Sequence, residues 1–336
     1  MLALNIQTSS IVLALFSSVF FTSIVSNYTF AANFGAAGDW GCNSNTGQTV
    51  NTIKNKSPSY VAALGDYSYT STATCWLDKI SSIKSKTKIA IGNHEDDDSE
   101  GFSQYKSAFS LGNTYYTWTY DHVRFIVMDS DRVSYSVGSS QYNFVLSELQ
   151  KASVDSNINW IIVYIHKPMY TSPNTCSSSS CSNTGSENRN LRNIYHKYFD
   201  QYGVDMVLDG HVHDYQRTYP IKYDSGSPDS PIKTSSNGFD WTDPTGEIFV
   251  MVGTGGVNFH ALSGKASFVV KQQDDKFGGL VISTEDSGNT LAGRYYTNDG
   301  AKFDTFKIHK ANFAITSQYT FGPSLTLSGE SVNTTK

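Results

Sequence analysis

The chain has 336 residues, of which 39% are hydrophobic and 16% are charged, and its formal net charge at pH 7 is −5. The negative charge excludes nucleic-acid binding by bulk electrostatics, and the hydrophobic content excludes a disordered chain. We therefore expect a globular protein that buries a substantial core.

The N-terminal segment predicts export. Residues 11–26 form an apolar run that is shorter than the roughly 20 apolar residues of a membrane-spanning helix. Small residues follow at Ala31 and Ala32, which is the layout of a cleaved secretory signal over residues 1–32. The alternative is an uncleaved N-terminal anchor, which would be the protein's membrane attachment. Both interpretations predict an exported protein, and the first predicts a secreted one.

Strand and helix patterns alternate over most of the chain. Buried strand patterns occupy residues 31–38, 60–64, 88–91, 123–129, 158–165, 204–209 and 247–253. Helical patterns lie between them at residues 76–83, 144–149 and 187–202. This alternation predicts an α/β fold built on a mostly parallel sheet.

The alternation of strand and helix patterns ends in the last third of the chain. Residues 221–245 are rich in Pro, Gly, Ser and Asp, which predicts a surface loop. Apolar strand patterns over residues 277–309, with the turn sequence NDG at 298–300, predict antiparallel strands joined by a tight hairpin. Residues 311–336 are polar, and we expect them to form a peripheral tail.

Four cysteines suit an oxidising compartment, where an even number in an exported chain indicates disulfides. They are Cys42, Cys75, Cys176 and Cys181, and three pairings are possible. A bridge between Cys176 and Cys181 would enclose four serines and stiffen a loop. Cys42 and Cys75 would then form the long-range pair.

Residues able to bind metals recur where the predicted strands end. These residues are Asp39, Asp66, Asn93, His94, His166, His211 and His213. In open α/β sheets, ligands collect beyond the carboxyl ends of the strands. Oxygen and imidazole donors from several strand ends indicate a site large enough for two metal ions.

The motifs DWG, GDYSY, GNHE, VYIH and GHVH, in this order, resemble those of the calcineurin-like metallophosphoesterases, and more narrowly those of the purple acid phosphatases. Many members of the wider superfamily have His at the third place of the first motif, where this chain has Gly41. The pattern Gly-Asp-x-x-Tyr instead supplies the phenol of Tyr69. The resemblance implies one catalytic domain over residues 33–310, with mixed sheets in a four-layer α/β/β/α sandwich.

The resemblance also implies a set of metal ligands. The first metal would be bound by Asp39, Tyr69 and His213, the second by Asn93, His166 and His211, and Asp66 would bridge them. Carboxylate and phenolate oxygens suit Fe(III), while amide and imidazole donors suit divalent Zn, Mn or Fe. The implied cofactors are therefore Fe(III) and a divalent ion that the sequence does not identify. Tyr67 lies at the wrong offset for the family pattern.

The implied function is that of a secreted acid phosphatase, which hydrolyses monoesters of small phosphorylated substrates by attack of a metal-bound hydroxide. His94 is the candidate for binding the substrate or protonating the leaving group. A phosphodiesterase or nucleotidase would use the same metals. A non-catalytic exported surface module is the third alternative, and it would be favoured by broken ligand positions. The sequence leaves the physiological ester and the oligomeric state open.

Three further features accompany these motifs. His122, His196 and His309 are expected to have no special role. The same is expected of His260, for which a position facing the site, directly after the sequence GTGG, is the alternative. The run EDDDSE at 95–100 is expected to be a solvated acidic loop. The alternative is a position beside the site, where the run would repel highly anionic substrates or recruit an extra cation. The loop after VYIH lacks the further histidines of relatives, and it is expected to shape the substrate entrance through Tyr170, Ser172 and Asn174.

Overall fold

The computed structural model describes residues 32–96 and 99–311. The predicted signal at 1–32 lies outside this part of the chain except for Ala32, and the tail at 311–336 lies outside it except for Ala311. Within the described residues, no helix is both long and apolar enough to cross a membrane.

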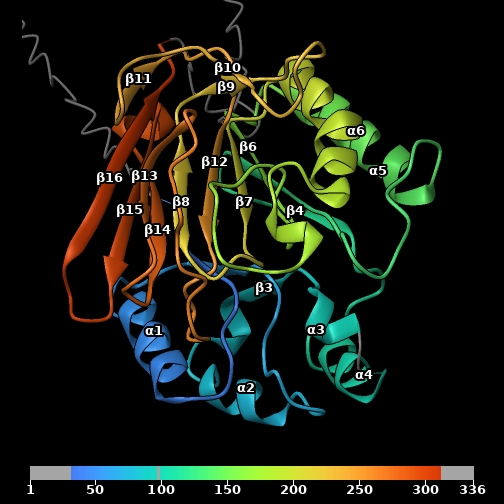
Figure 1. Cartoon of the computed structure of the whole chain (residues 1–336), viewed down its shortest axis with the longest axis vertical. Coiled ribbons are helices and arrows are strands. Elements are labelled where there is room, and N and C mark those ends of the chain that lie inside the picture. The colour runs from blue at the N-terminus through green and yellow to red at the C-terminus, as the bar shows by residue number, and fades with distance from the viewer. Residues whose placement is uncertain (1–31, 97–98, 312–336) are drawn as a thin grey trace, which may run out of the picture.

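Two seven-stranded mixed sheets form the centre of the molecule (Figure 1). The first has the order β11 (Asp240–Thr242), β16 (Lys302–His309), β15 (Thr290–Thr297), β14 (Gly278–Glu285), β1 (Asn33–Ala37), β2 (Tyr60–Ala63) and β3 (Thr87–Ile89). The second has the order β13 (Val269–Gln273), β8 (Tyr215–Thr218), β12 (Ile248–Val252), β7 (Met206–Asp209), β6 (Trp160–Tyr164), β5 (Val123–Val127) and β4 (Tyr116–Tyr120).

The seven strands predicted before residue 253 all form, with ends within two residues of the prediction. The mostly parallel sheet predicted from the strand pattern alone is wrong, because these strands are divided between two mixed sheets, as the resemblance implied. Strands β1, β2 and β3 run parallel in the first sheet, and β5, β6, β7 and β12 run parallel in the second. The antiparallel β14 pairs with β1, so the C-terminal hairpin completes the first sheet.

Alternation along the strands gives the second sheet two apolar faces. In β6, Ile162 and Tyr164 belong to the cluster between the sheets, while Ile161 and Val163 belong to the cluster on the outer face. Helices α5 (Ser140–Val154) and α6 (Ser186–Tyr202) cover that outer face (Figure 1). The strands therefore lack a polar face, which explains their continuous hydrophobic runs.

Helix α1 (Ser44–Lys54) packs on the first sheet and was not predicted. Its sequence is mostly polar, and its start is marked by Asn43, whose side chain accepts hydrogen bonds from the backbone N–H groups of Asn45 and Thr46. Ile53 reaches the sheet over Gly35 and Gly279, where a Cβ atom would lie 2.4 and 2.6 Å from its side chain. Two glycines of the sheet therefore admit a helix that has few apolar residues.

Other local predictions need correction. The 76–83 pattern forms α2 (Thr74–Lys79), a shorter helix that is followed by a turn. Residues 221–245 are not simply a loop, because they contain β9 (Ile221–Lys222), β10 (Ile232–Lys233) and β11. The described residues of the acidic run lie in helices α3 (Asn93–Asp96) and α4 (Ser99–Ala108), and residues 97–98 lie outside the described part of the chain.

Two disulfides join the four cysteines. Cys42 is bonded to Cys75 and Cys176 to Cys181, the pairing expected from the spacing. The first links the loop before α1 to α2, and the second closes the serine loop.

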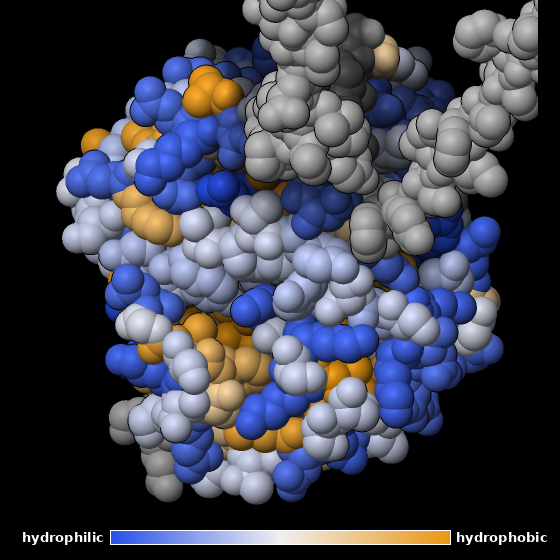
Figure 2. Space-filling model, turned by 180° about the vertical axis from the view of Figure 1, so that it is seen from behind, coloured by the Kyte–Doolittle hydropathy of each residue, from blue (hydrophilic) through white to orange (hydrophobic). Residues whose placement is uncertain are grey.

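The face of the molecule opposite to the view in Figure 1 is largely hydrophilic, with apolar side chains gathered in its lower half (Figure 2).

Candidate metal centre

The predicted ligands lie in loops that follow the parallel strands of both sheets. Asp39, Asp66, Tyr69 and His211 all have left-handed backbone angles, with φ of 58°, 53°, 53° and 69°. Such a conformation in a residue other than glycine costs of order 1–3 kcal/mol and is typical of functional sites. The surrounding fold therefore holds these four residues in conformations that they would not adopt in a free chain.

Glycines of the same motifs allow the carboxylates to approach the backbone. A Cβ atom on Gly92 would lie 2.3 Å from Asp66 Oδ1, and one on Gly210 would lie 2.6 Å from Asp39 Oδ2. Because these two positions have no room for a side chain, glycine is required at both of them.

The first group of donor atoms surrounds the phenol of Tyr69. Tyr69 Oη lies 3.3 Å from Asp39 Oδ1, 3.2 Å from Asp66 Oδ2 and 3.1 Å from His213 Nε2. His213 Nε2 is also 3.5 Å from Asp39 Oδ1. Four donors from three loops therefore converge on one point, because Asp66 and Tyr69 both lie in the loop after β2.

The second group shares Asp66 with the first. His166 Nε2 lies 3.2 Å from Asp66 Oδ2, 3.2 Å from Asn93 Oδ1 and 3.2 Å from His211 Nδ1. His166 and Asp66 are almost fully buried. The structure thus brings all seven predicted metal ligands together, in the two sets that the resemblance implied, with Asp66 between them.

Hydrogen bonds behind the histidines orient their free nitrogens. The Nδ1 atoms of His166 and His213 lie 2.8 Å from the backbone carbonyls of Leu64 and Asn258, which leaves each Nε2 facing the site. His211 is turned the other way, because its Nε2 is 2.6 Å from Ser180 Oγ. Such outer partners fix the tautomer and direction of metal-binding histidines.

The electrostatics of the site indicate that it requires positive charge. Burial raises the pKa of Asp39, because attraction to His213 and His166 offsets only part of the desolvation. Burial also raises the pKa of Tyr69 well above its usual range, and Asp66 and Asp39 raise it further. In a closed space these oxygens cannot all be anionic without counter-charge. Two cations would supply that charge, and the seven donors suit them.

His166 and Asp66 form the strongest pair within the site. Burial opposes the charge on both groups, but their mutual attraction raises the pKa of His166 to about 10 and lowers the pKa of Asp66 below its usual range. Burial and the charge of His166 lower the pKa of His211 well below its usual range, so His211 is neutral and able to bind a metal.

His94 lies at the mouth of the site. Its backbone N–H donates to Asp66 Oδ1 at 2.9 Å, and its Nε2 is 3.9 Å from Asp66 Oδ2. The ring packs on Tyr69 with 4.0 Å between centroids, and 41% of the side chain is exposed. His94 can therefore contact both solvent and a molecule bound at the centre.

His260 faces the site indirectly. Its ring stacks on His213 with 4.0 Å between centroids, and its Nδ1 accepts the His213 backbone N–H at 3.1 Å. Burial and the neighbouring His213 lower the pKa of His260 to about 4, so it is neutral above that pH.

Two supporting residues were missed. Glu95 was expected in a solvated loop, but it is buried and accepts the backbone N–H groups of Asp66, Tyr67 and Gly92. The sequence contained one indication that Glu95 lies at the site, because Glu95 directly follows the motif residues GNH. Ser180, one of four adjacent serines, orients His211, and nothing in the sequence distinguishes it from its neighbours.

The predicted substrate entrance is wrong for two of its three residues. Tyr170 and Ser172 are buried, and Tyr170 Oη contacts His196 while the Ser172 hydroxyl donates to Gln272. Asn174 donates to the Cys181 carbonyl and so supports the serine loop. The Cys-bounded loop reaches the centre through Ser180 instead.

The calcineurin-like phosphoesterase family matches residues 32–215, more than half of the chain. The chain belongs to this family. The purple acid phosphatase PPD1 of yellow lupin has the same fold, with a TM-score of 0.69 and 22% identity over 83% of this chain and 54% of that one. This likeness confirms the predicted α/β sandwich.

Two of the matching curated relatives carry names of different activities. A "nucleotide pyrophosphatase/phosphodiesterase" of Hordeum vulgare is 28% identical over 68% of this chain and 64% of its own length. "Acid phosphatase type 7" of Danio rerio is 26% identical over 70% of this chain and 58% of its own length. The chain therefore spans less than two thirds of the length of these relatives.

Proposed function

We propose that this chain is a secreted phosphatase that hydrolyses small phosphate monoesters at a two-metal centre. The observation that carries the proposal is the convergence of seven donor side chains in two sets that share Asp66. When bound, two metal ions would neutralise charge on the phosphoryl group and activate water for attack.

The donor sets support different metals at the two positions. Asp39, Tyr69 and His213 offer two anionic oxygens and one imidazole, a set that suits Fe(III). Asn93, His166 and His211 offer an amide oxygen and two imidazoles, which suit divalent Zn, Mn or Fe. Asp66 lies between the sets and would bridge the ions.

His94 is proposed as the residue that meets the substrate. Its exposed ring lies beside Tyr69 and above Asp66, so Nε2 can donate a hydrogen bond to a phosphoryl oxygen or deliver a proton to the leaving oxygen. Its backbone N–H donates to Asp66 Oδ1, which anchors the main chain that carries the ring, and the ring itself packs on Tyr69.

Export and a single catalytic domain are part of the proposal. Two disulfides support an oxidising compartment. The pairing of β1 with β14 supports one domain over residues 33–310, because the first sheet needs strands from both ends of it. Residues 1–32 as a signal and 311–336 as a tail remain predictions.

Phosphodiester hydrolysis is the second candidate, favoured by the name of the barley relative. A direct comparison of p-nitrophenyl phosphate with bis-p-nitrophenyl phosphate separates the two. The proposed function predicts a higher kcat/KM for the monoester, together with two metal ions at the centre. A preference for the diester would favour the second candidate. Absence of hydrolysis of either ester by metal-loaded protein would favour a non-catalytic module.

A further inference from the structure

A second cluster of metal-binding residue types lies outside the centre described above. His196 and Asp200 are on α6, and Glu247 directly precedes β12. One ligand atom from each of the three lies within 4.8 Å of the other two. Because β12 runs parallel to β7, Glu247 lies at the amino edge of the second sheet, whereas the metal centre lies beyond the carboxyl ends.

The cluster contains a buried carboxylate with unused oxygens. The side chains of His196 and Glu247 are fully buried, and His196 Nε2 is 3.0 Å from Glu247 Oε1. Apart from this contact, the Glu247 oxygens have no hydrogen-bond partner among the described residues, nor does Asp200 Oδ1. Buried polar groups are rarely left unsatisfied, so these oxygens indicate a missing partner.

Outer contacts orient two members of the cluster, as they do at the metal centre. Tyr170 Oη lies 2.7 Å from His196 Nδ1, so Nε2 is the nitrogen that faces Glu247. Asp200 Oδ2 accepts the Tyr223 backbone N–H at 2.9 Å, which leaves Oδ1 for another partner. Metal-binding histidines and carboxylates have outer partners of this kind.

A simple buried ion pair leaves one carboxylate of the cluster unbalanced when both carboxylates are ionised. A protonated His196 would balance one carboxylate, but Glu247 and Asp200 together carry two negative charges when ionised. Burial raises the pKa of Glu247 to about 7, although His196 opposes the shift. Lys310, which lines the neighbouring cavity, is already paired with Asp205 at 2.7 Å. One divalent cation with a neutral His196 would balance both carboxylates.

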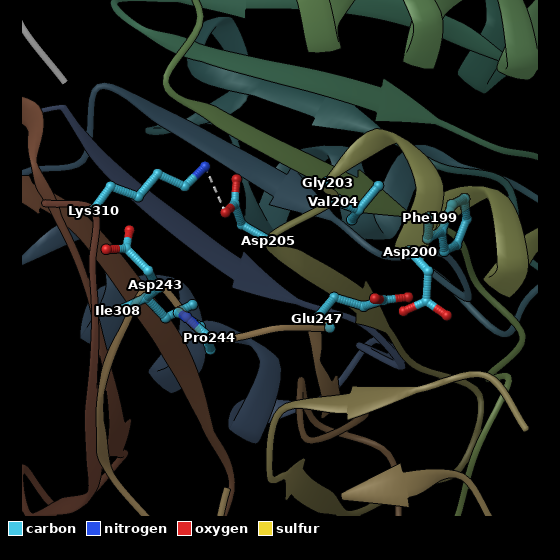
Figure 3. A pocket seen from close by; sticks show the side chains of 11 residues that line it. Phe199, Asp200, Gly203, Val204, Asp205, Asp243, Pro244, Glu247, Ile308 and Lys310 are labelled. Atoms are coloured by element: carbon cyan, nitrogen blue, oxygen red, sulfur yellow. Dashed lines mark ion pairs between the residues drawn. The ribbon is translucent and has the colours of Figure 1, made fainter. Parts of the chain in front are cut away.

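A cavity of about 200 Å³ adjoins the cluster and provides access. Figure 3 shows the side chains of Asp200 and Glu247 directed toward one another at one end of this cavity, away from Asp205 and Lys310 at the other. The cavity has room for water to complete the coordination of an ion.

We propose that His196, Asp200 and Glu247 bind one divalent cation, and that Zn²⁺ is the preferred ion. One imidazole and two carboxylates form a donor set that suits zinc, whereas Mg²⁺ and Ca²⁺ favour oxygen ligands. The ion would tie the last turns of α6 to the start of β12 and so stabilise the packing of the helix on the sheet.

The test compares zinc content in the full chain. Wild type, Asp200→Asn and Glu247→Gln are exposed to Zn²⁺, separated from unbound ion by gel filtration and analysed by mass spectrometry of the metal. Each variant is expected to hold one zinc ion fewer per chain than wild type. The zinc-dependent rise in the unfolding midpoint is expected to be smaller by about 5 °C in the variants at a free zinc concentration near 100 Kd.

Asp205→Asn is the matched control, because Asp205 lines the same cavity but belongs to the Lys310 pair. It should hold as much zinc as wild type. Asp200 is only partly buried, so its variant provides the result if Glu247→Gln does not fold. Equal zinc content in wild type and Asp200→Asn would overturn the proposal, whatever the metal centre itself holds.

Discussion

The metal centre and the His196 cluster use similar side chains but are built in different ways. At the centre, four of the seven ligands have positive φ angles, and glycines at the strand ends make room for the carboxylates. In the cluster, His196 and Asp200 are four residues apart on a regular helix, so they lie on one face without backbone strain. Only Glu247 comes from a distant segment.

This difference separates a chemical site from a structural one. Strained loop positions aim several donors at a shared point and leave one side open at His94, where 41% of the side chain is exposed. The cluster has fully buried His196 and Glu247 side chains and is reached from a small cavity. An ion there would stabilise the fold, whereas ions at the centre would contact substrate.

The largest expected effect is that of Asp66→Asn. Losing a bridging charge should cost more than the roughly 10–100-fold that follows loss of an outer partner, so phosphatase activity should fall by well over a hundredfold. Metal analysis should show loss of both ions at the centre and retention of the ion at the cluster. Asp299→Asn, on the exposed surface, should match wild type. An Asp66→Asn protein with two tightly bound ions at the centre would refute the bridge.

Substitution of Asp304 tests how much a buried carboxylate contributes to stability when both of its oxygens are paired. Arg217 Nε and Nη2 donate to its two oxygens at 2.7 and 3.0 Å. We expect Asp304→Asn to lower the free energy of unfolding by roughly 3–5 kcal/mol, measured by urea denaturation. Glu247→Gln in metal-free protein should cost less, because its oxygens lack such partners. A larger loss from Glu247→Gln would contradict the proposed difference between the two sites.

The Asp304 pair also predicts a pH dependence. Burial opposes the charge, but Arg217 lowers the pKa of Asp304 below its ordinary value of 3.8. A depressed pKa in the folded state contributes stability above the unfolded value and loses it as pH falls through the folded value. Wild type should therefore lose more stability than Asp304→Asn as the pH falls below about 4. Parallel stability curves for the two proteins would contradict this assignment.

Ser180→Ala tests the support of one ligand. Loss of the Ser180 hydroxyl from His211 Nε2 should weaken binding of the second metal by about 10–100-fold, measured by metal titration. Ser182→Ala is the control, because Ser182 is exposed and its hydroxyl contacts the hydroxyl of Thr184 and none of the described ligands of the centre. Equal metal affinity in both variants would remove Ser180 from the site.

Tyr69→Phe should have the smallest effect on activity but a complete effect on colour. A phenolate bound to Fe(III) absorbs visible light by charge transfer, so the oxidised wild type should be violet and the variant colourless. Asp39, Asp66 and His213 would still bind the metal, so part of the activity should remain. Tyr67→Phe should keep the colour, since that phenol donates to Ala63 and Ala90 carbonyls instead. A colourless, active wild type with two zinc or manganese ions would exclude Fe(III).

The sequence by itself determined most of the strands and every predicted ligand of the centre. Each ligand occurs in a short motif at a strand end. Ligands of α/β sheets collect beyond the carboxyl ends of the strands, so residues at these ends are expected to lie together. The buried strands were visible because apolar residues run continuously through them. Helix α1 was not visible in the sequence, because it is mostly polar and packs on the sheet through Ile53, which contacts Gly35 and Gly279.

Only the tertiary structure decided which strands belong to which of the two sheets, since β14 must return from the far end of the chain to pair with β1. It also decided the roles of Glu95 and Ser180, whose partners are backbone groups and a ligand from other loops. The pairing of His196 with Glu247, 51 residues away, could not be predicted for the same reason. Local patterns specify elements and strand-end motifs, while contacts between distant segments arise when whole faces pack together.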